Sequence, residues 1–308
     1  MIYFEIAAGL ILLIIGGDLL VRGSVGVARY FGVSPLLIGL TLIGFGTSTP
    51  ELVASVQAAL AHAPGIAVGN VVGSNIANSL LILGVAALVR PLETPSSGFR
   101  RDAGMMLLSA LACTGVVLAG FIGRWMGAAL LGLLIVYMVY TYRNERVAPG
   151  PAREGKTLMN PWVAALAAIG ALVMIILGAR LLVFGAINLA QQAGISETVL
   201  GLTVVAVGTS LPELAAAIIA ALRGHPFIAF GNVVGSNIYN VLGILGATAL
   251  IHPIVVPEQI AHVDIWVMLA AMVLLTIFAA TGWRLSRAEG AALLTAYAAY
   301  IGYLIYAA

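Results

Sequence analysis

The same phrase occurs twice in this chain. Residues 69–76 read Gly-Asn-Val-Val-Gly-Ser-Asn-Ile, and residues 231–238 repeat that string without a change. At a constant offset of 162 residues, 40 of the 76 positions in 16–91 are identical to those in 178–253. Shared apolar composition does not produce eight consecutive matches that include Asn and Ser. The sequence therefore predicts a duplication, and the fold must be one that two copies of a single unit can build.

The charge content shows that this unit folds in lipid. Only 8% of the 308 residues are charged and 62% are hydrophobic, whereas a soluble domain carries about 25% charged residues. So few charges cannot cover the surface of a soluble protein of this size, and we expect an all-α integral membrane protein. A net charge of +2 provides no basic patch for nucleic acid, and a single Cys excludes a disulfide scaffold.

Apolar stretches near the length that crosses a bilayer, about 20 residues, occur ten times. The first stretch lacks the basic leading region of a secretory signal, so we interpret it as a span. The ten predicted spans are residues 2–22, 35–60, 66–89, 103–122, 124–142, 161–187, 197–222, 226–251, 263–282 and 286–307.

Ten spans in two copies give five spans per copy. We expect five-helix repeats at 1–145 and 161–308, joined by a cytoplasmic linker at 146–160. The duplicated phrases define an α-repeat in each copy, at 35–90 and 197–252. Because five is odd, the second copy must enter the membrane from the opposite side. Such inverted repeats are typical of secondary transporters, whose substrate site lies near mid-membrane between the repeats.

The basic residues predict the orientation. With the N-terminus outside, twelve of the 14 Lys and Arg residues fall in cytoplasmic loops, and only Arg124 and Arg180 fall outside. Basic loops stay in the cytoplasm. We therefore expect both termini outside, the loop at 143–160 inside, and a multi-pass location in the cell (plasma or inner) membrane.

Two of the twelve acidic residues lie in the middle of predicted spans at equivalent positions. Glu51 and Glu213 each end the phrase Gly-Thr-Ser-x-Pro-Glu. An ionised acid at this depth costs about 2.5–3.5 kcal/mol on insertion scales, which makes it a functional candidate. Pro50 and Pro212 have no N–H group and crowd the carbonyl four residues earlier, so each helix should break here. The freed carbonyls, hydroxyls and carboxylates are hard oxygen ligands that suit Na⁺ or Ca²⁺.

The Asn-rich phrase predicts a second helix in each copy that packs against the broken one. Polar residues four apart share one helix face; they are Asn70, Ser74 and Asn78 in the first copy and Asn232, Ser236 and Asn240 in the second. Asn70 and Asn232 have an alternative role, in which they bind backbone groups freed by the break. The four histidines, near predicted membrane edges, have no metal-ligand spacing and are given no role: His62, His225, His252 and His262.

These phrases resemble the two α-repeats of the cation/calcium exchanger superfamily, most closely its prokaryotic sodium/calcium exchangers. Gly-Thr-Ser-Thr-Pro-Glu precedes the first Asn-rich phrase, and Gly-Thr-Ser-Leu-Pro-Glu precedes the second. The resemblance covers nearly the whole chain. It implies ten transmembrane helices in two inverted repeats, broken at mid-membrane, and electrogenic exchange of several Na⁺ for one Ca²⁺. Both ions are substrates, and no cofactor, enzymatic activity or obligatory protein partner is implied.

The resemblance also implies a set of ion ligands. It places Ca²⁺ between the carboxylates of Glu51 and Glu213, assisted by the backbone carbonyls of Thr47 and Thr209. The sodium sites would use the same two acids together with further oxygen atoms, from Ser48, Ser210, Ser74, Ser236 and the carbonyls of Gly44 and Ala206. Asn78 and Asn240 would line the middle of the cluster. Some relatives, notably exchangers that also move K⁺, carry Asp in place of Asn240, so Asn here weakens a K⁺-coupled interpretation.

The function expected from the sequence is an antiporter that extrudes Ca²⁺ as Na⁺ enters, by alternating access. Shared ligands would make the two ions compete, and the first and sixth spans would slide past the ion-binding core. Three alternatives remain open: a Ca²⁺/H⁺ antiporter with the two acids as proton carriers, a passive cation channel, and an intramembrane enzyme. The hydroxyl-rich phrases favour Na⁺, and the sequence shows no paired Asp, His-Glu-x-x-His or Ser/Lys constellation for an enzyme.

Overall fold

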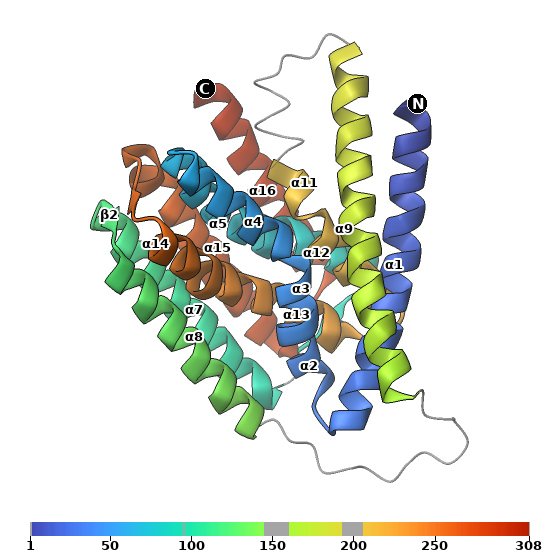
Figure 1. Ribbon diagram of the computed structural model, residues 1–308. Coiled ribbons are helices and arrows are strands. Elements are labelled where there is room, and N and C mark those ends of the chain that lie inside the picture. The colour runs from blue at the N-terminus through green and yellow to red at the C-terminus, as the bar shows by residue number, and fades with distance from the viewer. Residues whose placement is uncertain (1, 95, 145–159, 193–205, 308) are drawn as a thin grey trace.

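A computed structural model describes residues 2–94, 96–144, 160–192 and 206–307 of the chain (Figure 1). It is mainly helical, as the composition predicts. The α-helices of the first half are α1 (Ile2–Phe31), α2 (Pro35–Ile38), α3 (Gly44–Thr47), α4 (Thr49–Leu60), α5 (Pro64–Ile76), α6 (Leu83–Val89), α7 (Ser96–Leu118) and α8 (Arg124–Asn144). Those of the second half are α9 (Pro161–Gln192), α11 (Ala206–Thr209), α12 (Leu211–Leu222), α13 (Pro226–Tyr239), α14 (Gly246–Ile251), α15 (Ile265–Ala280) and α16 (Arg287–Ala307).

Several helices are joined by wider turns that the sequence did not predict. The π-helical segments are η1 (Gly39–Ile43), η2 (Ala77–Ile82), η4 (Asn240–Leu245) and η5 (Ile260–Asp264), and a 3₁₀ turn, η6 (Thr281–Trp283), follows α15. Because η2 and η4 continue straight from α5 and α13, the chain forms unbroken helical spans over Pro64–Val89 and Pro226–Ile251. π-Helical turns of this kind are frequent at functional sites.

Eight helices in the described residues are long and apolar enough to cross a membrane. A ninth span results when the bent pair Leu36–Thr47 and Thr49–Leu60 is counted as one. The predicted span at 197–222 is represented by the shorter apolar helix Leu211–Leu222, since 193–205 lie outside the described residues. The number of ten spans therefore stays a prediction, as does the linker, of which 145–159 also lie outside them.

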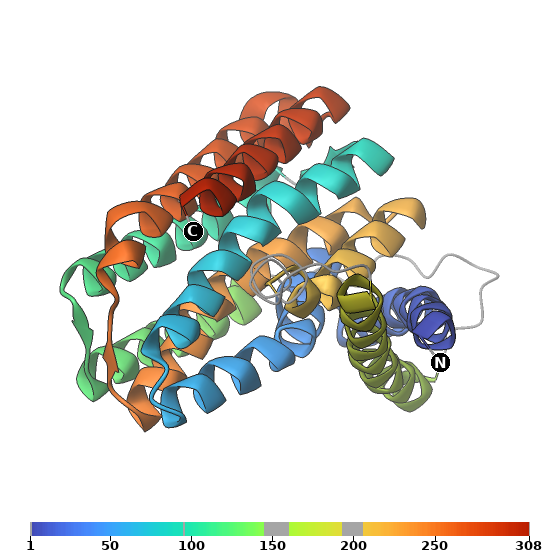
Figure 2. The same ribbon diagram turned by 90° about the horizontal axis from the view of Figure 1, so that it is seen from above.

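The long helices α1 and α9 lie side by side at one edge of the molecule (Figures 1 and 2). Their backbones approach closely where small residues face each other. A side chain on Gly9 would lie 2.8 Å from the carbonyl oxygen of Gly178, and one on Gly178 would lie 2.9 Å from that of Gly9. Small residues allow this kind of packing between membrane helices. Both helices extend beyond the predicted ends at residues 22 and 187, because a membrane helix can continue into the polar boundary.

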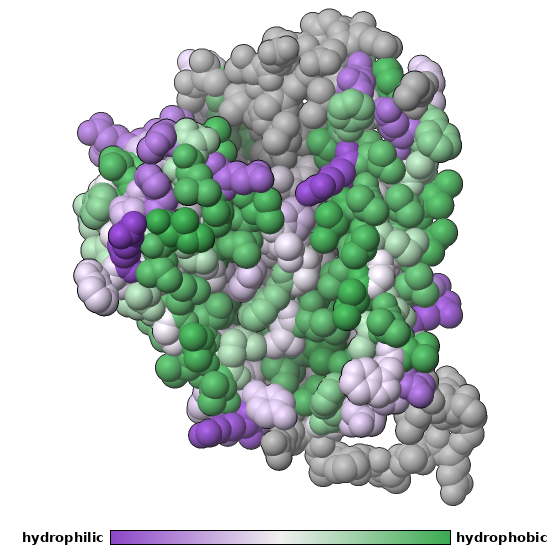
Figure 3. Space-filling view, viewed as in Figure 1, coloured by the Kyte–Doolittle hydropathy of each residue, from purple (hydrophilic) through white to green (hydrophobic). Residues whose placement is uncertain are grey.

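The spans Pro64–Val89 and Pro226–Ile251 form the centre of the fold. Most of their residues are buried, whereas α16 exposes most of its surface. In Figure 3, hydrophobic side chains fill the middle of the face in view, and the most hydrophilic ones lie mainly toward its upper and lower parts. This distribution fits an outer surface in contact with lipid. The chain ends marked in Figure 1 lie at the same end of the molecule.

Two short antiparallel ribbons join the halves and depart from the all-α prediction. Strand β1 (Leu92–Glu93) pairs with β4 (Arg284–Leu285), with Leu92 opposite Leu285. Strand β2 (Phe121–Ile122) pairs with β3 (Ile254–Val255), with Ile122 opposite Ile254. Each ribbon takes one strand from each half. β2 also separates α7 from α8, so the two predicted spans around Gly123 are distinct helices.

Candidate ion-binding site

The two acidic residues lie just after the helix breaks that the sequence predicts. The helix axis bends by 44° between Leu36–Thr47 and Thr49–Leu60. Ser48 leaves the helical conformation at the break (φ −82°, ψ 8°), and Ser210 does so at the equivalent place (φ −91°, ψ 5°). Glu51 and Glu213 follow in the first turns of α4 and α12, and each is only 1% exposed. The positive end of a helix dipole favours an acid in this turn.

Hydrogen bonds join the two breaks into one cluster. The Ser48 hydroxyl donates to Oε1 of Glu213 at 2.8 Å, so the break of one half contacts the acid of the other. The Ser236 hydroxyl donates to the carbonyl oxygen of Gly44 at 3.3 Å, and the Thr47 hydroxyl lies 3.3 Å from Oδ1 of Asn232. The site is thus built from both halves.

Asn70 and Asn232 hold each Asn-rich helix against its broken partner. Nδ2 of Asn70 donates to the backbone carbonyl of Glu51 at 3.1 Å, and Nδ2 of Asn232 donates to that of Glu213 at 3.3 Å. Each amide therefore binds a backbone carbonyl of the helix that follows the break, five residues after the carbonyl of Gly46 or Gly208 that proline was expected to free. The packing of α5 on α4 and of α13 on α12, expected from the sequence, is confirmed.

Asn78 and Asn240 lie at the starts of the π-helical segments η2 and η4, and each is 1% exposed. Nδ2 of Asn240 donates to Oδ1 of Asn75 at 3.3 Å, and Nδ2 of Asn237 donates to the Ser79 hydroxyl at 2.9 Å. Asn75, Asn237 and Ser79 have no role in the predictions made from the sequence. Asn75 and Asn237 belong to the duplicated phrase, and Ser79 follows its first copy by three residues. This position in the sequence was the signal that could have identified them.

Several buried oxygen atoms of the cluster have no hydrogen-bond partner among the described residues. They are Oε2 of Glu51, Oε2 of Glu213, Oδ1 of Asn78, Oδ1 of Asn240 and the Ser210 hydroxyl oxygen. An unsatisfied buried polar atom costs about 1–3 kcal/mol, and more for a charged group. Hard oxygen atoms gathered in this way can be satisfied by a hard cation such as Na⁺ or Ca²⁺.

The donor set contains two carboxylates and no soft ligands. Within the described ranges, no group of three or more His, Cys, Asp or Glu side chains could hold a metal ion. The cluster therefore depends on neutral oxygen atoms to complete its coordination. Oxygen ligands of this kind suit Na⁺ or Ca²⁺ rather than a metal that prefers thiolates.

The remaining predicted ligands lie around this cluster. Ser74 is buried on α5, and Gly44 and Thr47 are buried at the ends of α3. Ala206 begins α11 and half-buried Thr209 ends it. The segment before Ala206 lies outside the described residues.

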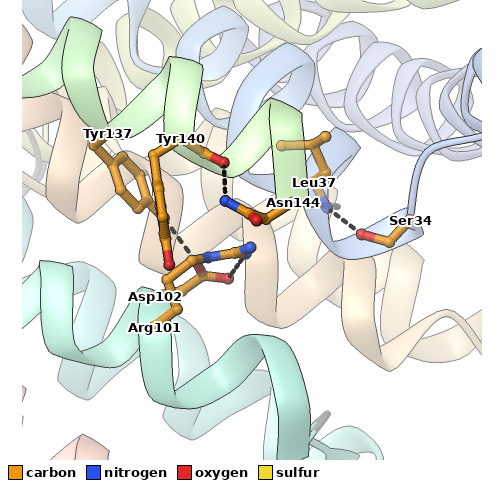
Figure 4. A network of polar contacts seen from close by, with 7 residues as sticks. All are labelled: Ser34, Leu37, Arg101, Asp102, Tyr137, Tyr140 and Asn144. Atoms are coloured by element: carbon orange, nitrogen blue, oxygen red, sulfur yellow. Dashed lines mark hydrogen bonds and ion pairs between the residues drawn. The ribbon is translucent and has the colours of Figure 1, made fainter. Parts of the chain in front are cut away.

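A second polar network lies between α7 and α8 (Figure 4). Buried Asp102 accepts a hydrogen bond from the Tyr137 hydroxyl at 2.9 Å and another from Nη2 of Arg101 at 2.9 Å. The duplicated position behaves similarly, because Asp264 accepts a bond from the Tyr300 hydroxyl at 2.8 Å. Asp102 lies just before the predicted start of a span at residue 103, so the sequence did not predict its burial. Each network ties a pair of outer helices together.

Paired acids beside broken helices, in a fold of membrane-length apolar helices, are typical of multi-span membrane transporters. The chain belongs to the sodium/calcium exchanger family, since a family model described as "Sodium/calcium exchanger protein" matches residues 2–143 and 163–306.

Relatives and solved structures agree with this assignment. The chain is 35% identical to the sodium/calcium exchanger MaX1 of Methanosarcina acetivorans, over 97% of each chain, and 36% identical to a putative antiporter, CaxA, of Alkalimonas amylolytica, over 96% of each. It is 37% identical to the inner membrane protein YrbG of Escherichia coli, over 92% of this chain and 89% of that one. A structure of the sodium-calcium exchanger NCX_Mj, soaked with Na⁺ and Sr²⁺, superimposes with a TM-score of 0.86 at 33% identity, over 98% of this chain and 97% of that one.

Proposed function

We propose that this protein is an antiporter that exchanges Na⁺ for Ca²⁺ across the cell membrane and extrudes Ca²⁺ as Na⁺ enters. The observation that carries the proposal is the buried cluster of unpartnered oxygen atoms around Glu51 and Glu213. Two carboxylates give a formal charge of −2, which one Ca²⁺ or two Na⁺ would neutralise. The name of MaX1, a sodium/calcium exchanger, supports the same pair of ions.

The ligands in this proposal are the twelve residues predicted from the sequence. Ca²⁺ lies between the carboxylates of Glu51 and Glu213, with the carbonyls of Thr47 and Thr209. Na⁺ uses the same acids, together with Ser48, Ser74, Ser210, Ser236 and the carbonyls of Gly44 and Ala206, and Asn78 and Asn240 line the centre. The hydrogen bond from Ser48 to Glu213 supports this arrangement, because it brings a predicted sodium ligand to a shared acid. Ions that share ligands compete, and competition is the basis of exchange.

The architecture that we propose has ten spans in two inverted repeats. The offset of 162 residues, the ribbons that pair one half with the other and the two separate matches to the family model support it. Ten spans put both termini on the same side, and the excess of Lys and Arg in the opposite loops supports termini outside and the linker at 146–160 in the cytoplasm. Inverted halves give a protein two mirror-related conformations of similar energy, which is the physical basis of alternating access.

Movement of the α1 and α9 pair is the proposed source of alternating access. Both helices stand at the edge of the fold (Figure 2), whereas Glu51 on α4 and Glu213 on α12 are buried. Glycine contacts hold the two helices to each other. They can therefore move together past the site while the hydrogen bonds among its residues persist.

The test is Ca²⁺ uptake into proteoliposomes that contain the purified full chain. Vesicles loaded with Na⁺ should accumulate ⁴⁵Ca²⁺ from a Na⁺-free medium, and this uptake should saturate and respond to a voltage set with valinomycin and K⁺. Vesicles without an Na⁺ gradient are the control. Uptake driven by a pH gradient alone would identify a Ca²⁺/H⁺ antiporter, and dissipation of every cation gradient would identify a channel. Either result would contradict the proposal.

A further inference from the structure

Two histidines that are far apart in the sequence meet at the surface of the protein. His62 lies in the turn between α4 and α5, and His252 directly follows α14. Their ring centroids are 5.3 Å apart, with an angle of 77° between the ring planes. His62 is exposed and His252 is half-buried, so solutes can reach both rings. Nothing in the oxygen cluster requires this pair.

The separation of the two rings fits a shared metal ion. A zinc ion binds each imidazole nitrogen at about 2.0–2.1 Å, which puts each ring centroid about 3.2 Å from the metal. At a tetrahedral angle, two such centroids lie about 5.2 Å apart. The observed centroids match this separation, and because the ring torsion of His is broad, rotation can aim both nitrogens at one point.

The orientation of His252 leaves one nitrogen available to a metal. Its Nδ1 lies 3.0 Å from the carbonyl oxygen of Pro253. Because a carbonyl oxygen only accepts hydrogen bonds, this contact favours the neutral tautomer with the proton on Nδ1, in which Nε2 has a lone pair for a metal. Metal-binding histidines almost always donate their other N–H group to a carbonyl or carboxylate in this way.

The duplication supplies an internal comparison for the pair. The position equivalent to His62 is Gly224, and both residues have left-handed backbone angles, with φ of 57° and 77°. Glycine adopts this conformation without cost, whereas a residue with a side chain is strained by about 1 kcal/mol. The position equivalent to His252 is Arg90, whose Nη1 would lie 3.3 Å from a side chain built on Gly224. The fold therefore juxtaposes these two positions in both halves, and strain at such a place points to a function.

We propose that His62 and His252 form a surface site for a borderline transition-metal ion such as Zn²⁺, Ni²⁺ or Cu²⁺. Imidazole nitrogen suits these ions, whereas Na⁺ and Ca²⁺ prefer oxygen, so the site is chemically distinct from the oxygen cluster. No third His, Cys, Asp or Glu of the described residues joins the pair, so water completes the coordination. A bound ion ties the turn after α4 to the end of α14. This inference does not depend on the proposed exchange activity.

The experiment is a calorimetric titration of Zn²⁺ into the purified full chain, without a polyhistidine tag and with excess Ca²⁺ present. We expect saturable binding of one ion per chain, with an affinity that falls by about tenfold or more in His62→Gly and in His252→Gln. His62→Gly should fold, because Gly224 occupies the same conformation in the other half. His262→Gln is the matched control and should bind as the unchanged chain does. X-ray absorption at the zinc edge should report two imidazole nitrogens at about 2.0–2.1 Å.

Three results would overturn the proposal. They are an unchanged affinity in either pair variant, an equal loss in His262→Gln, and displacement of Zn²⁺ by Ca²⁺, which would assign the binding to the oxygen cluster. Because the readout is binding alone, a failure of the exchange proposal leaves this test intact, and the reverse also holds.

Discussion

The two halves of this protein share one sequence plan but make different contacts at the site. Ser48 donates to the acid of the opposite half, whereas the hydroxyl oxygen of its counterpart Ser210 has no partner among the described residues. Asn70 donates to Ser55 at 2.8 Å, but Ala217 replaces that serine in the second half. A symmetric duplication therefore holds an asymmetric set of hydrogen bonds.

Gly73 and Gly235, equivalent glycines of the two Asn-rich helices, also differ in the contacts that they make among the described residues. A side chain on Gly235 would lie 2.4 Å from the carbonyl oxygen of Leu40, but one on Gly73 would meet nothing within 4 Å among the described residues. Among the described residues, the second copy is the one that is packed at this position. The counterpart of Leu40 is residue 202, which lies outside the described residues.

Replacement of either acid should have the largest effect and should erase the difference between the halves. In Glu51→Gln and in Glu213→Gln, one of the two negative charges that we propose to neutralise Ca²⁺ is lost. Removal of a buried charge partner costs about 3–5 kcal/mol, so Na⁺-dependent ⁴⁵Ca²⁺ uptake in proteoliposomes should fall by about 100-fold or more. Normal uptake by either variant, inserted at the same density as the unchanged chain, would refute the site.

Alanine at Gly235 and alanine at Gly73 should have different effects on the free energy of unfolding. Gly235→Ala drives a methyl group into the backbone of Leu40, so we expect a loss of about 1–3 kcal/mol. A side chain on Gly73 meets nothing within 4 Å among the described residues, so Gly73→Ala should be neutral or stabilising by up to about 1 kcal/mol, because Ala favours helix. The thermal midpoint in detergent is the measurement. Equal midpoints for the two variants would show that the packing of the halves does not differ.

The serines at the breaks should differ by a smaller amount. Ser48→Ala removes the donor to Glu213 and should lower stability in Na⁺-free and Ca²⁺-free detergent by about 1.5–2 kcal/mol. Ser210→Ala removes a buried hydroxyl that has no hydrogen-bond partner within the described residues, so it should leave stability unchanged or raise it by about 1 kcal/mol. Chemical denaturation of both variants tests this. A larger loss in Ser210→Ala than in Ser48→Ala would invert the comparison.

Ser55→Ala should have the smallest effect, because it places in the first half the alanine that the second half has at the equivalent position, Ala217. The amide of Asn70 loses one acceptor but keeps the carbonyl of Glu51, so we expect a loss of about 1 kcal/mol and little change in uptake. Denaturation and flux measured on the same preparation test both parts. A loss of uptake as severe as that of Glu51→Gln would show that Ser55 belongs to the ion site itself.

Local sequence signals predicted the parts of the site that depend on a few neighbouring residues. Pro50 removes an N–H group and Gly46 tolerates an altered backbone, so the break at Ser48 follows from a short phrase. The packing of the Asn-rich helix on the broken one follows from residues four apart. These features need no information from the rest of the chain.

Other features depended on contacts between distant residues. A ribbon strand of two residues has no periodicity, and the π-helical turns carry no pattern distinct from an α-helix. The bond between Asn240 and Asn75 joins residues 165 positions apart, and Asp102 is buried through a tyrosine 35 positions away. The sequence does not indicate which of many possible distant partners each of these residues contacts.

The sequence alone predicts a duplicated helical membrane protein with one acid after a break in each copy. That much follows from the low charge content, the repeated phrases and the missing N–H group of proline. The contacts of Ser48 with Glu213, of Gly235 with Leu40 and of His62 with His252 emerge only when the chain is folded. Local chemistry fixes what a residue can do, but the packing of both halves fixes which partner it meets.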